Sequence, residues 1–274
     1  MAYSLLPNFP YSMDMFALFP SREITLTVAG FSVHWYGIMY LLAFLLAYWL
    51  LPRLQKYRGL SLTRDDWSTI VSYVVVGVIV GGRLGYVLFY DPVFFLSNPL
   101  QIFAVWNGGM ASHGGFAGVI AALYLVSRRL RVDFWKLADL AIVPAAIGLA
   151  FGRVGNFINQ ELYGTVTTLP WGMEFPGAEG LRHPTQLYAV FKNLTVASLC
   201  FMHLKRVQDA PHGRTAALFL VLYGIARFIV EHFREQTHAG FDLGIVSLTR
   251  GQALTIPLIL TGIIVLILLK RRKA

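Results

Sequence analysis

The chain has 274 residues, of which 56% are hydrophobic and 14% are charged, and its formal net charge is +9. A soluble domain carries about a quarter of charged residues, so this composition excludes an ordinary soluble protein and indicates an integral membrane protein. The positive charge lies in short segments between apolar runs, which is typical of membrane orientation signals and argues against nucleic-acid binding. The single cysteine, Cys200, excludes a disulfide framework within the chain.

Seven apolar segments are predicted to cross the membrane as helices, within one polytopic domain that covers residues 1–274. In chain order they are Ser32–Leu51, Thr69–Tyr90, Ser112–Leu130, Leu137–Phe151, Leu187–Leu204, Thr215–Val230 and Gln252–Leu269. The fourth is short and contains Pro144, which can kink it. Gly77, Gly81 and Gly85 recur at four-residue spacing in the second, which predicts close packing against another helix. The sequence therefore predicts an all-α membrane protein of about seven helices.

Basic residues follow every second predicted segment. They are Arg53, Lys56, Arg58, Arg64, Arg128, Arg129, Arg131, Lys136, Lys205, Arg206, Arg214 and the run at residues 270–273. Cytoplasmic loops of membrane proteins are enriched in Lys and Arg. We therefore expect the N-terminus outside and the C-terminus in the cytoplasm.

Polar residues at membrane depth gather at the predicted outer ends of the segments. A charged residue at the centre of a membrane helix costs about 2.5–3.5 kcal/mol on insertion scales, so such residues call for a functional hypothesis. The clusters are Ser112–Gly115, Gly152–Asn159, His183, and Arg227 with Glu231 and Arg234. Their convergence predicts a functional site facing the outer leaflet.

The spacing of these residues places several of them on shared helix faces. Tyr223, Arg227 and Glu231 are four residues apart, and Arg153 and Asn156 are three apart. Arginine offers paired donors that match phosphate oxygens. Two arginines near the outer interface therefore suit a lipid phosphodiester.

Simpler structural interpretations stay open for each residue. Arg227 and Glu231 could neutralise each other within the bundle, and Arg153 could anchor the protein at lipid headgroups. His113 could be a hydrogen-bonded core histidine, although its glycine-rich helix start also attracts anions. Cys200 lies far from the polar clusters and is interpreted as an apolar filler.

Five stretches, in order along most of the chain, carry a resemblance to a known family. They are His34–Gly37, Gly109–Gly115, Gly152–Glu161, His183–Tyr188 and Tyr223–Glu231. The third reads GRVGNFINQE, and Gly-Arg-x-Gly-Asn-Phe-x-Asn is a specific pattern for a membrane helix. At these residues the chain resembles prolipoprotein diacylglyceryl transferases.

The resemblance implies seven spans with a small outer head between the fourth and fifth, at about residues 159–186. It implies a bacterial cytoplasmic membrane enzyme that needs no cofactor, takes phosphatidylglycerol as donor and modifies the lipobox cysteine of prolipoproteins. It makes Arg153 and Arg227 contacts of the lipid phosphate. The further residues implied in catalysis or substrate binding are Tyr36, His113, Asn156, Glu161, Tyr223, Glu231 and Arg234.

The implied chemistry is consistent with these residue types. A thiolate would attack an sp³ carbon of the diacylglyceryl group and displace glycerol phosphate. Negative charge grows on the departing phosphate, so arginines held there would lower the barrier. His113 or a carboxylate such as Glu231 could act as the base. No His, Cys and carboxylate cluster in the sequence has metal-ligand spacing.

Two other functions are weighed against this one. A transporter or flippase for anionic lipids would also hold arginines, but it predicts polar residues along a whole path across the bilayer. The predicted inner halves of the third, fifth and seventh segments are almost wholly apolar. An intramembrane serine protease would use Ser112, but the adjacent His113 points away from it on a helix.

Overall fold

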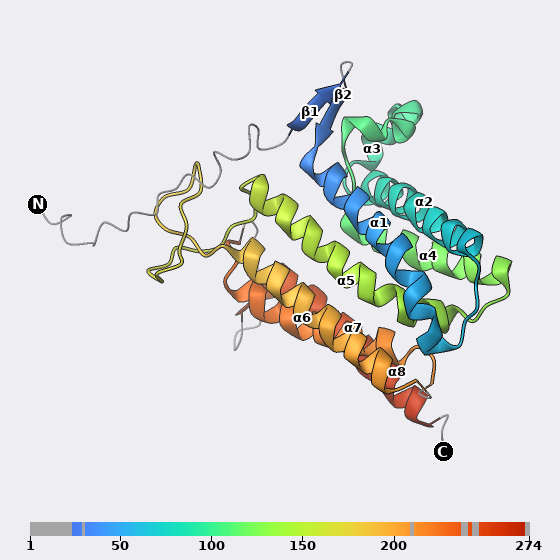
Figure 1. Ribbon diagram of the computed structural model, residues 1–274. Coiled ribbons are helices and arrows are strands. Elements are labelled where there is room, and N and C mark those ends of the chain that lie inside the picture. The colour runs from blue at the N-terminus through green and yellow to red at the C-terminus, as the bar shows by residue number, and fades with distance from the viewer. Residues whose placement is uncertain (1–23, 29–30, 209–210, 237–240, 243–246, 272–274) are drawn as a thin grey trace, which may run out of the picture.

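The computed structural model describes residues 24–28, 31–208, 211–236, 241–242 and 247–271. Within these residues the long helices form the bundle drawn in Figure 1. They are α1 (Trp35–Leu54), α2 (Arg64–Phe89), α4 (Ser112–Leu130), α5 (Phe134–Ile158), α6 (Thr185–Arg206), α7 (Arg214–His232) and α8 (Arg250–Arg271). Short helices η2 (Gln55–Arg58), α3 (Pro92–Ser97), η3 (Pro99–Phe103) and η4 (Val105–Asn107) lie in the connections after α1 and α2.

Six of these helices are long and apolar enough to cross a membrane, so the protein is a multi-pass membrane protein, as predicted. They are α1, α2, α5, α6, α7 and α8. The remaining long helix, α4, has 19 residues, but Ser112 and His113 at its start and Arg128 and Arg129 at its end lower its mean hydropathy. The predicted bounds of this segment are correct.

Two short antiparallel strand pairs, which the all-α prediction does not include, accompany the helices. Strand β1 (Ile24–Val28) pairs with β2 (Phe31–His34), and β3 (Phe241–Asp242) pairs with β4 (Ser247–Leu248). The first helix consequently begins at Trp35 and not at Ser32. Strand β1 reads ITLTV, and β-branched residues of this kind favour extended backbone.

Helix α5 is longer than its predicted span. It begins after Asp133, whose side chain accepts the backbone N–H of Trp135 at 2.8 Å, and it runs through Pro144. It also continues through Asn156, whose side chain is buried in the bundle. The predicted span ended at Phe151, whereas the polar residues that follow continue the helix to Ile158.

Helices α2 and α4 pack closely through glycine, as the four-residue spacing predicted. A Cβ atom on Gly77 or Gly81 would collide with the backbone of Gly118 or Gly114 on α4, and one on Gly85 would collide with Gly114. Only hydrogen at these positions lets the two backbones approach so closely.

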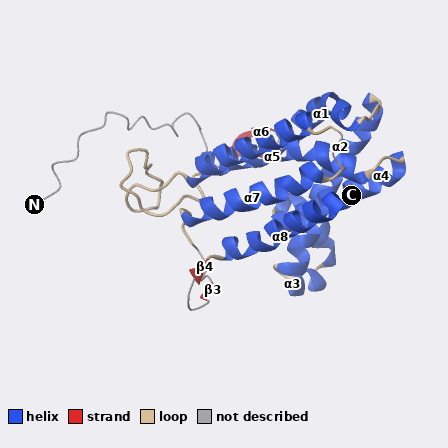
Figure 2. Ribbon diagram, turned by 90° about the horizontal axis from the view of Figure 1, so that it is seen from below, coloured by secondary structure: helices blue, strands red, loops and turns tan. Residues whose placement is uncertain are grey.

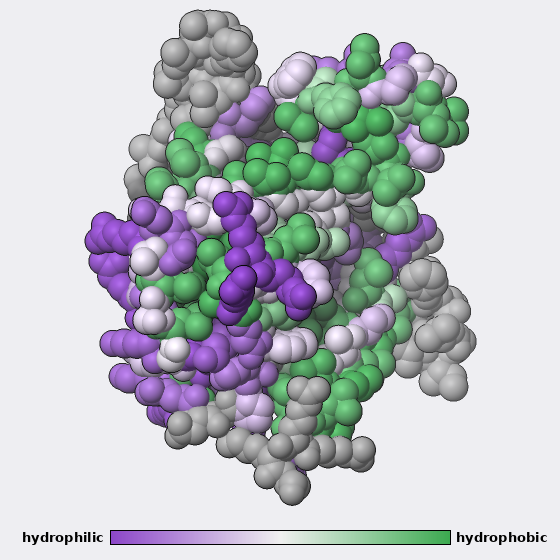
Figure 3. Space-filling model, turned by 90° about the vertical axis from the view of Figure 1, so that its right-hand side faces the viewer, coloured by the Kyte–Doolittle hydropathy of each residue, from purple (hydrophilic) through white to green (hydrophobic). Residues whose placement is uncertain are grey.

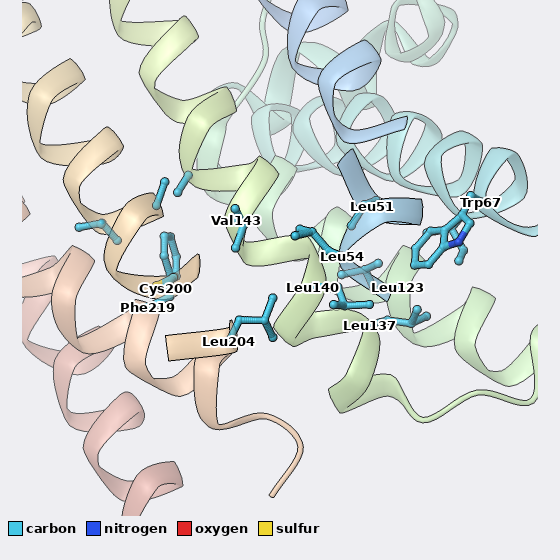
Figure 4. Close-up of a cluster of buried hydrophobic side chains, with 14 of the residues drawn as sticks. Leu51, Leu54, Trp67, Leu123, Leu137, Leu140, Val143, Cys200, Leu204 and Phe219 are labelled. Carbon is cyan, nitrogen blue, oxygen red and sulfur yellow. The ribbon is translucent and has the colours of Figure 1, made fainter. Parts of the chain in front are cut away.

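Buried hydrophobic side chains from six helices form the core in Figure 4. The labelled members are Leu51, Leu54, Trp67, Leu123, Leu137, Leu140, Val143, Cys200, Leu204 and Phe219. Cys200 has no exposed surface, which confirms that it is an apolar filler. Around this core, the side that carries the start of α2 and the end of α4 shows broad hydrophobic surface beside a hydrophilic part (Figure 3).

A fully buried ion pair ties η2 to α5 and α7. Arg58 Nε donates to Asp139 Oδ2 at 2.8 Å, and Arg58 Nη2 donates to Thr215 Oγ1 at 2.9 Å. The Asp139 carboxylate also accepts the backbone N–H groups of Gly213 and Ala216, at 2.9 and 2.8 Å, where α7 begins. Arg58 is therefore not one of the free loop cations that the sequence analysis counts for membrane orientation.

The connection between α5 and α6 (residues 159–184) projects from one end of the bundle in Figures 1 and 2. It contains no helix, and isolated bridges pair Val166 and Met173 with Arg182. Its extent agrees with the predicted insertion at about residues 159–186, except that α6 already begins at Thr185.

Candidate active site

Three residues that are far apart in the sequence form one hydrogen-bonded group at the end of α5. Tyr36 lies in the first turn of α1, Asn156 in the last turn of α5, and Glu161 in the loop that follows. The Tyr36 hydroxyl donates to Glu161 Oε1, and Asn156 Nδ2 donates to the same oxygen at 2.9 Å and to the Tyr36 hydroxyl. Arg153 Nη1 donates to Asn156 Oδ1 at 3.1 Å, so this group fixes the direction of the guanidinium.

The backbone around Glu161 is held in an unfavourable turn. Gln160 and Leu162, on either side of it, have φ values of 58° and 59°. This left-handed region costs a residue other than glycine roughly 1–2 kcal/mol. The start of α6 holds the turn, because Gln186 Nε2 donates to the Glu161 carbonyl at 2.7 Å and Thr185 Oγ1 donates to the Leu162 carbonyl at 2.8 Å. Strain of this kind is common where a side chain must be aimed for function.

A second charged group lies at the end of α7. Arg227 Nη2 is 2.7 Å from Glu231 Oε2, and Arg234 Nη1 is 3.7 Å from the same oxygen. Glu231 is buried, with 4% of its surface exposed. At the start of α8, a Cβ atom on Gly251 would collide with the Glu231 carboxylate, so glycine leaves the space that this side chain occupies. The spacing placed Arg227 and Glu231 on one helix face, and their ion pair is the mutual neutralisation that the sequence analysis left open.

Arg234 links this group to the connection between α5 and α6. Gly164 pairs with Arg234 as an isolated antiparallel bridge, and the Thr165 N–H donates to the Phe233 carbonyl at 3.0 Å. A Cβ atom on Gly164 would collide with that carbonyl. The pKa of the Arg234 guanidinium is lowered, mainly because the group is buried. Glu231 acts against this shift, and the positive charge of Arg227 adds to it. The neighbouring cation thus opposes the charge of Arg234.

The structure brings the two groups together. Arg227 and Arg234 are the cations that act electrostatically on Arg153, although Arg153 belongs to a different helix. Among the described residues, Glu231 is the carboxylate paired with Arg227 and Arg234, and no ion pair involves Arg153. The guanidinium groups of α5 and α7 therefore interact electrostatically, while the convergence of all four polar clusters at the outer leaflet stays a prediction.

One residue of this region is absent from the predicted site. Lys192 of α6 has only 7% of its surface exposed, and its Nζ lies 3.7 Å from the centroid of the Tyr223 ring. Arg227 and Arg153 are the charged groups that act on it. A lysine in the middle of an apolar segment was the signal available in the sequence.

The two histidines of the predicted polar clusters have different surroundings. His113 lies in the first turn of α4, as predicted, and is exposed. No hydrogen bond or ion pair joins it to Arg153 or Arg227 in the part of the chain that is described. His183 contacts Tyr188, whose hydroxyl is 3.0 Å from Nδ1, and packs against the ring of Phe233.

The described residues offer no group of three or more His, Cys, Asp and Glu side chains that could hold a metal ion. The site is instead built from cations, two carboxylates and neutral hydrogen-bonding groups. Such a set can bind an anion and orient it.

Comparison with known proteins finds similar sequences over most of the chain. The family model described as prolipoprotein diacylglyceryl transferase matches residues 23–268. A phosphatidylglycerol–prolipoprotein diacylglyceryl transferase of Geobacter sulfurreducens is 46% identical over 241 residues, which cover 87% of this chain and 92% of that protein. Proteins of the same name from Wolbachia pipientis subsp. Culex pipiens and Nitratidesulfovibrio vulgaris are 41% and 44% identical; each alignment covers 88% of this chain and 92% or 91% of the relative.

These matches extend over nearly all of the described bundle, including both charged groups at the ends of α5 and α7. The chain therefore belongs to the prolipoprotein diacylglyceryl transferase family.

Proposed function

We propose that this protein transfers the diacylglyceryl group of phosphatidylglycerol to the lipobox cysteine thiol of prolipoproteins, the first step of lipoprotein maturation. The family and the names of the relatives support this activity. The observation that carries it is that Arg153 and Arg227, on different helices, act on one another beside the group formed by Tyr36, Asn156 and Glu161. Such paired guanidinium groups suit a lipid phosphate.

The reaction forms a sulfur–carbon bond between the thiolate and the glycerol carbon that carries the phosphate ester. The carbon–oxygen bond to that phosphate breaks, and its electron pair leaves with glycerol phosphate. The substrate phosphodiester carries one negative charge, and the departing monoester approaches two. Arg153 and Arg227 would therefore interact more strongly with the transition state than with the substrate, which is the condition for raising turnover.

The remaining residues act through these two arginines or contact the substrate. Asn156 accepts from Arg153 and is held by Glu161 and Tyr36, while Glu231 holds Arg227. We propose that Tyr36 and Glu231 serve catalysis in this way. The residues that we propose to bind substrate are Arg153, Asn156, Glu161, Tyr223, Arg227 and Arg234.

Two side chains are proposed to accept the thiol proton. Glu231 is ion-paired with both Arg227 and Arg234, whereas His113 is exposed. Transferase rates of His113→Gln and Glu231→Gln measured against pH separate them. The variant that lacks the base should lose the rising limb of the profile, while the other keeps it.

We propose that α4 also crosses the membrane, as the third of seven spans in chain order. The N-terminus would then lie outside and the C-terminus in the cytoplasm, with residues 159–186 as a head on the outer side. The active site would then face the outer leaflet of a bacterial cytoplasmic membrane. The basic residues Arg128, Arg129 and Lys205, which are exposed, favour this orientation. A reporter active only in the cytoplasm should work when fused after Ala274 and should be silent within Asn98–Val105; activity at the second place would reverse the orientation.

The activity itself is tested with purified protein, phosphatidylglycerol and a lipobox peptide. We expect mass spectrometry to show the peptide with a diacylglyceryl thioether, together with released glycerol phosphate. The alternative function, a transporter or flippase for anionic lipid, predicts redistribution of labelled lipid between leaflets and an unmodified peptide. That second result would refute the proposal.

A further inference from the structure

Lys192 is buried in a way that its local contacts do not explain. Lysines in membrane helices usually extend along the helix until the ammonium reaches the interface. Lys192 instead has 7% of its surface exposed and points its ammonium at the face of Tyr223, 3.7 Å from the ring centroid. A cation–π contact stabilises a charge by much less than the burial of that charge destabilises it. The Tyr223 contact therefore positions the ammonium but does not offset its burial.

The charged neighbours make this burial less favourable still. Arg227 and Arg153 both act on the Lys192 ammonium, and both repel it. No hydrogen bond or ion pair of Lys192 with another described residue is present. Arg153 of α5, Lys192 of α6 and Arg227 of α7 thus lie in one region, and among the described residues only Arg227 has a carboxylate as an ion-pair partner.

Their combined charge indicates the ligand. The cations are Arg153, Lys192, Arg227 and Arg234. Glu231 is ion-paired with Arg227 and Arg234, and Glu161 accepts a hydrogen bond from Asn156, which in turn accepts one from Arg153. When Lys192 is protonated, the described residues of the site therefore carry two more positive charges than negative ones. A phosphodiester would balance one of them, and a phosphate monoester dianion would balance both. The cluster is therefore better matched to the departing product than to the lipid substrate.

We propose that Lys192 is a third phosphate-binding cation, which meets the second negative charge that forms on glycerol phosphate as the carbon–oxygen bond breaks. This inference rests on the proposed transferase activity. The planar guanidinium of arginine matches the two phosphate oxygens that do not change during the reaction. The ammonium of lysine has three rotatable N–H donors, which can turn toward the ester oxygen as it is released from carbon. Tyr223 is then a positioning residue, since its ring holds the Lys192 ammonium.

The test compares Lys192→Met, Lys192→Arg and the control Lys205→Met, which removes an exposed lysine from the other end of the same helix. Turnover and KM are measured over a range of phosphatidylglycerol mole fractions, together with inhibition by added glycerol phosphate and the thermal midpoint. We expect Lys192→Met to lower turnover by about 10²–10³. Inhibition by glycerol phosphate should weaken about tenfold or more, and Lys192→Arg should restore part of both.

The thermal midpoint separates this role from a structural one. Removing an unpaired buried cation should leave the midpoint of Lys192→Met unchanged or raise it. Three results would each refute the inference: unchanged turnover and inhibition in Lys192→Met, lost activity that follows a lowered midpoint, or loss of the rising limb of the pH profile with unchanged inhibition, which would make Lys192 the base. Absence of thioether product with the wild-type protein would instead refute the transferase activity itself.

Discussion

The two ends of α7 each carry buried charges, but the charges are balanced at only one of them. At the first end, Arg58, Asp139 and Thr215 form what we call the Arg58 cluster, in which both charged side chains have no exposed surface. At the other end, Arg153, Lys192, Arg227, Glu231 and Arg234 form the Arg153 cluster, in which basic side chains outnumber the carboxylate of Glu231.

The difference teaches which buried charges stabilise the protein and which await a ligand. In the Arg58 cluster, Asp139 accepts hydrogen bonds from the guanidinium and from two backbone N–H groups at the start of α7. Groups of the protein therefore neutralise the charge of Arg58 and satisfy the Asp139 carboxylate. In the Arg153 cluster the like charges repel one another, and the phosphate that we propose as ligand would offset this repulsion. We therefore expect substitutions in the first cluster to lower stability and those in the second to lower turnover.

The largest effect is expected for Asp139→Asn, which leaves Arg58 buried without its counterion. Breaking a fully buried pair in this way should lower the free energy of unfolding by about 3–5 kcal/mol. Unfolding in detergent micelles, followed by circular dichroism, measures it. Asp133→Asn is the control, because it removes a half-exposed ion pair with His212 and should change stability by less than about 1 kcal/mol. Equal stability of Asp139→Asn and the wild type would contradict the structural role of the Arg58 cluster.

Arg153→Lys and Arg227→Lys should each lower turnover by about 10²–10³ at saturating phosphatidylglycerol, with little change in stability. Lysine keeps the charge but loses the planar fork that matches phosphate. Kinetics in nanodiscs over a range of lipid mole fractions measure the effect. A raised KM with intact turnover would show that these arginines only bind or anchor lipid.

Tyr36→Phe should lower turnover by about 10- to 100-fold, because a hydrogen bond to a charged group contributes about 1.5–3 kcal/mol. The variant removes the hydroxyl that joins Asn156 to Glu161 and keeps the ring. Tyr48→Phe, in the same helix with 40% of the residue exposed, is the matched control and should keep wild-type turnover. If both variants behave alike, the hydrogen-bonded group at the end of α5 is not required for the reaction.

The smallest effect is expected for Cys200→Ala. Cys200 lies in the apolar core and not in either charged cluster, so its replacement should lower the free energy of unfolding by about 1 kcal/mol and leave most transferase activity. Peptide modification per folded protein is the measurement. Complete loss of activity in a folded variant would point to a covalent enzyme intermediate.

The sequence by itself determined the features that depend on local periodicity. The apolar runs predicted the helices, four-residue spacing placed Arg227 and Glu231 on one helix face, and the spacing of Gly77, Gly81 and Gly85 predicted close packing of α2 against another helix. Three-residue spacing likewise predicted that Arg153 and Asn156 meet on one face. These contacts follow from the helix repeat alone, because residues three or four positions apart are neighbours on any α-helix.

Only the tertiary structure decided which helices are neighbours, and with that the environment of each charge. Arg58 reads as a loop cation in the sequence, yet its partner Asp139 lies 81 residues away on α5. Lys192 reads as an isolated lysine, and the packing of α6 against α7 places it on Tyr223 beside two arginines. The physical reason is that the energy of a buried charge depends on counterions, hydrogen bonds and solvent access, which are set by contacts between helices and not by the spacing within one.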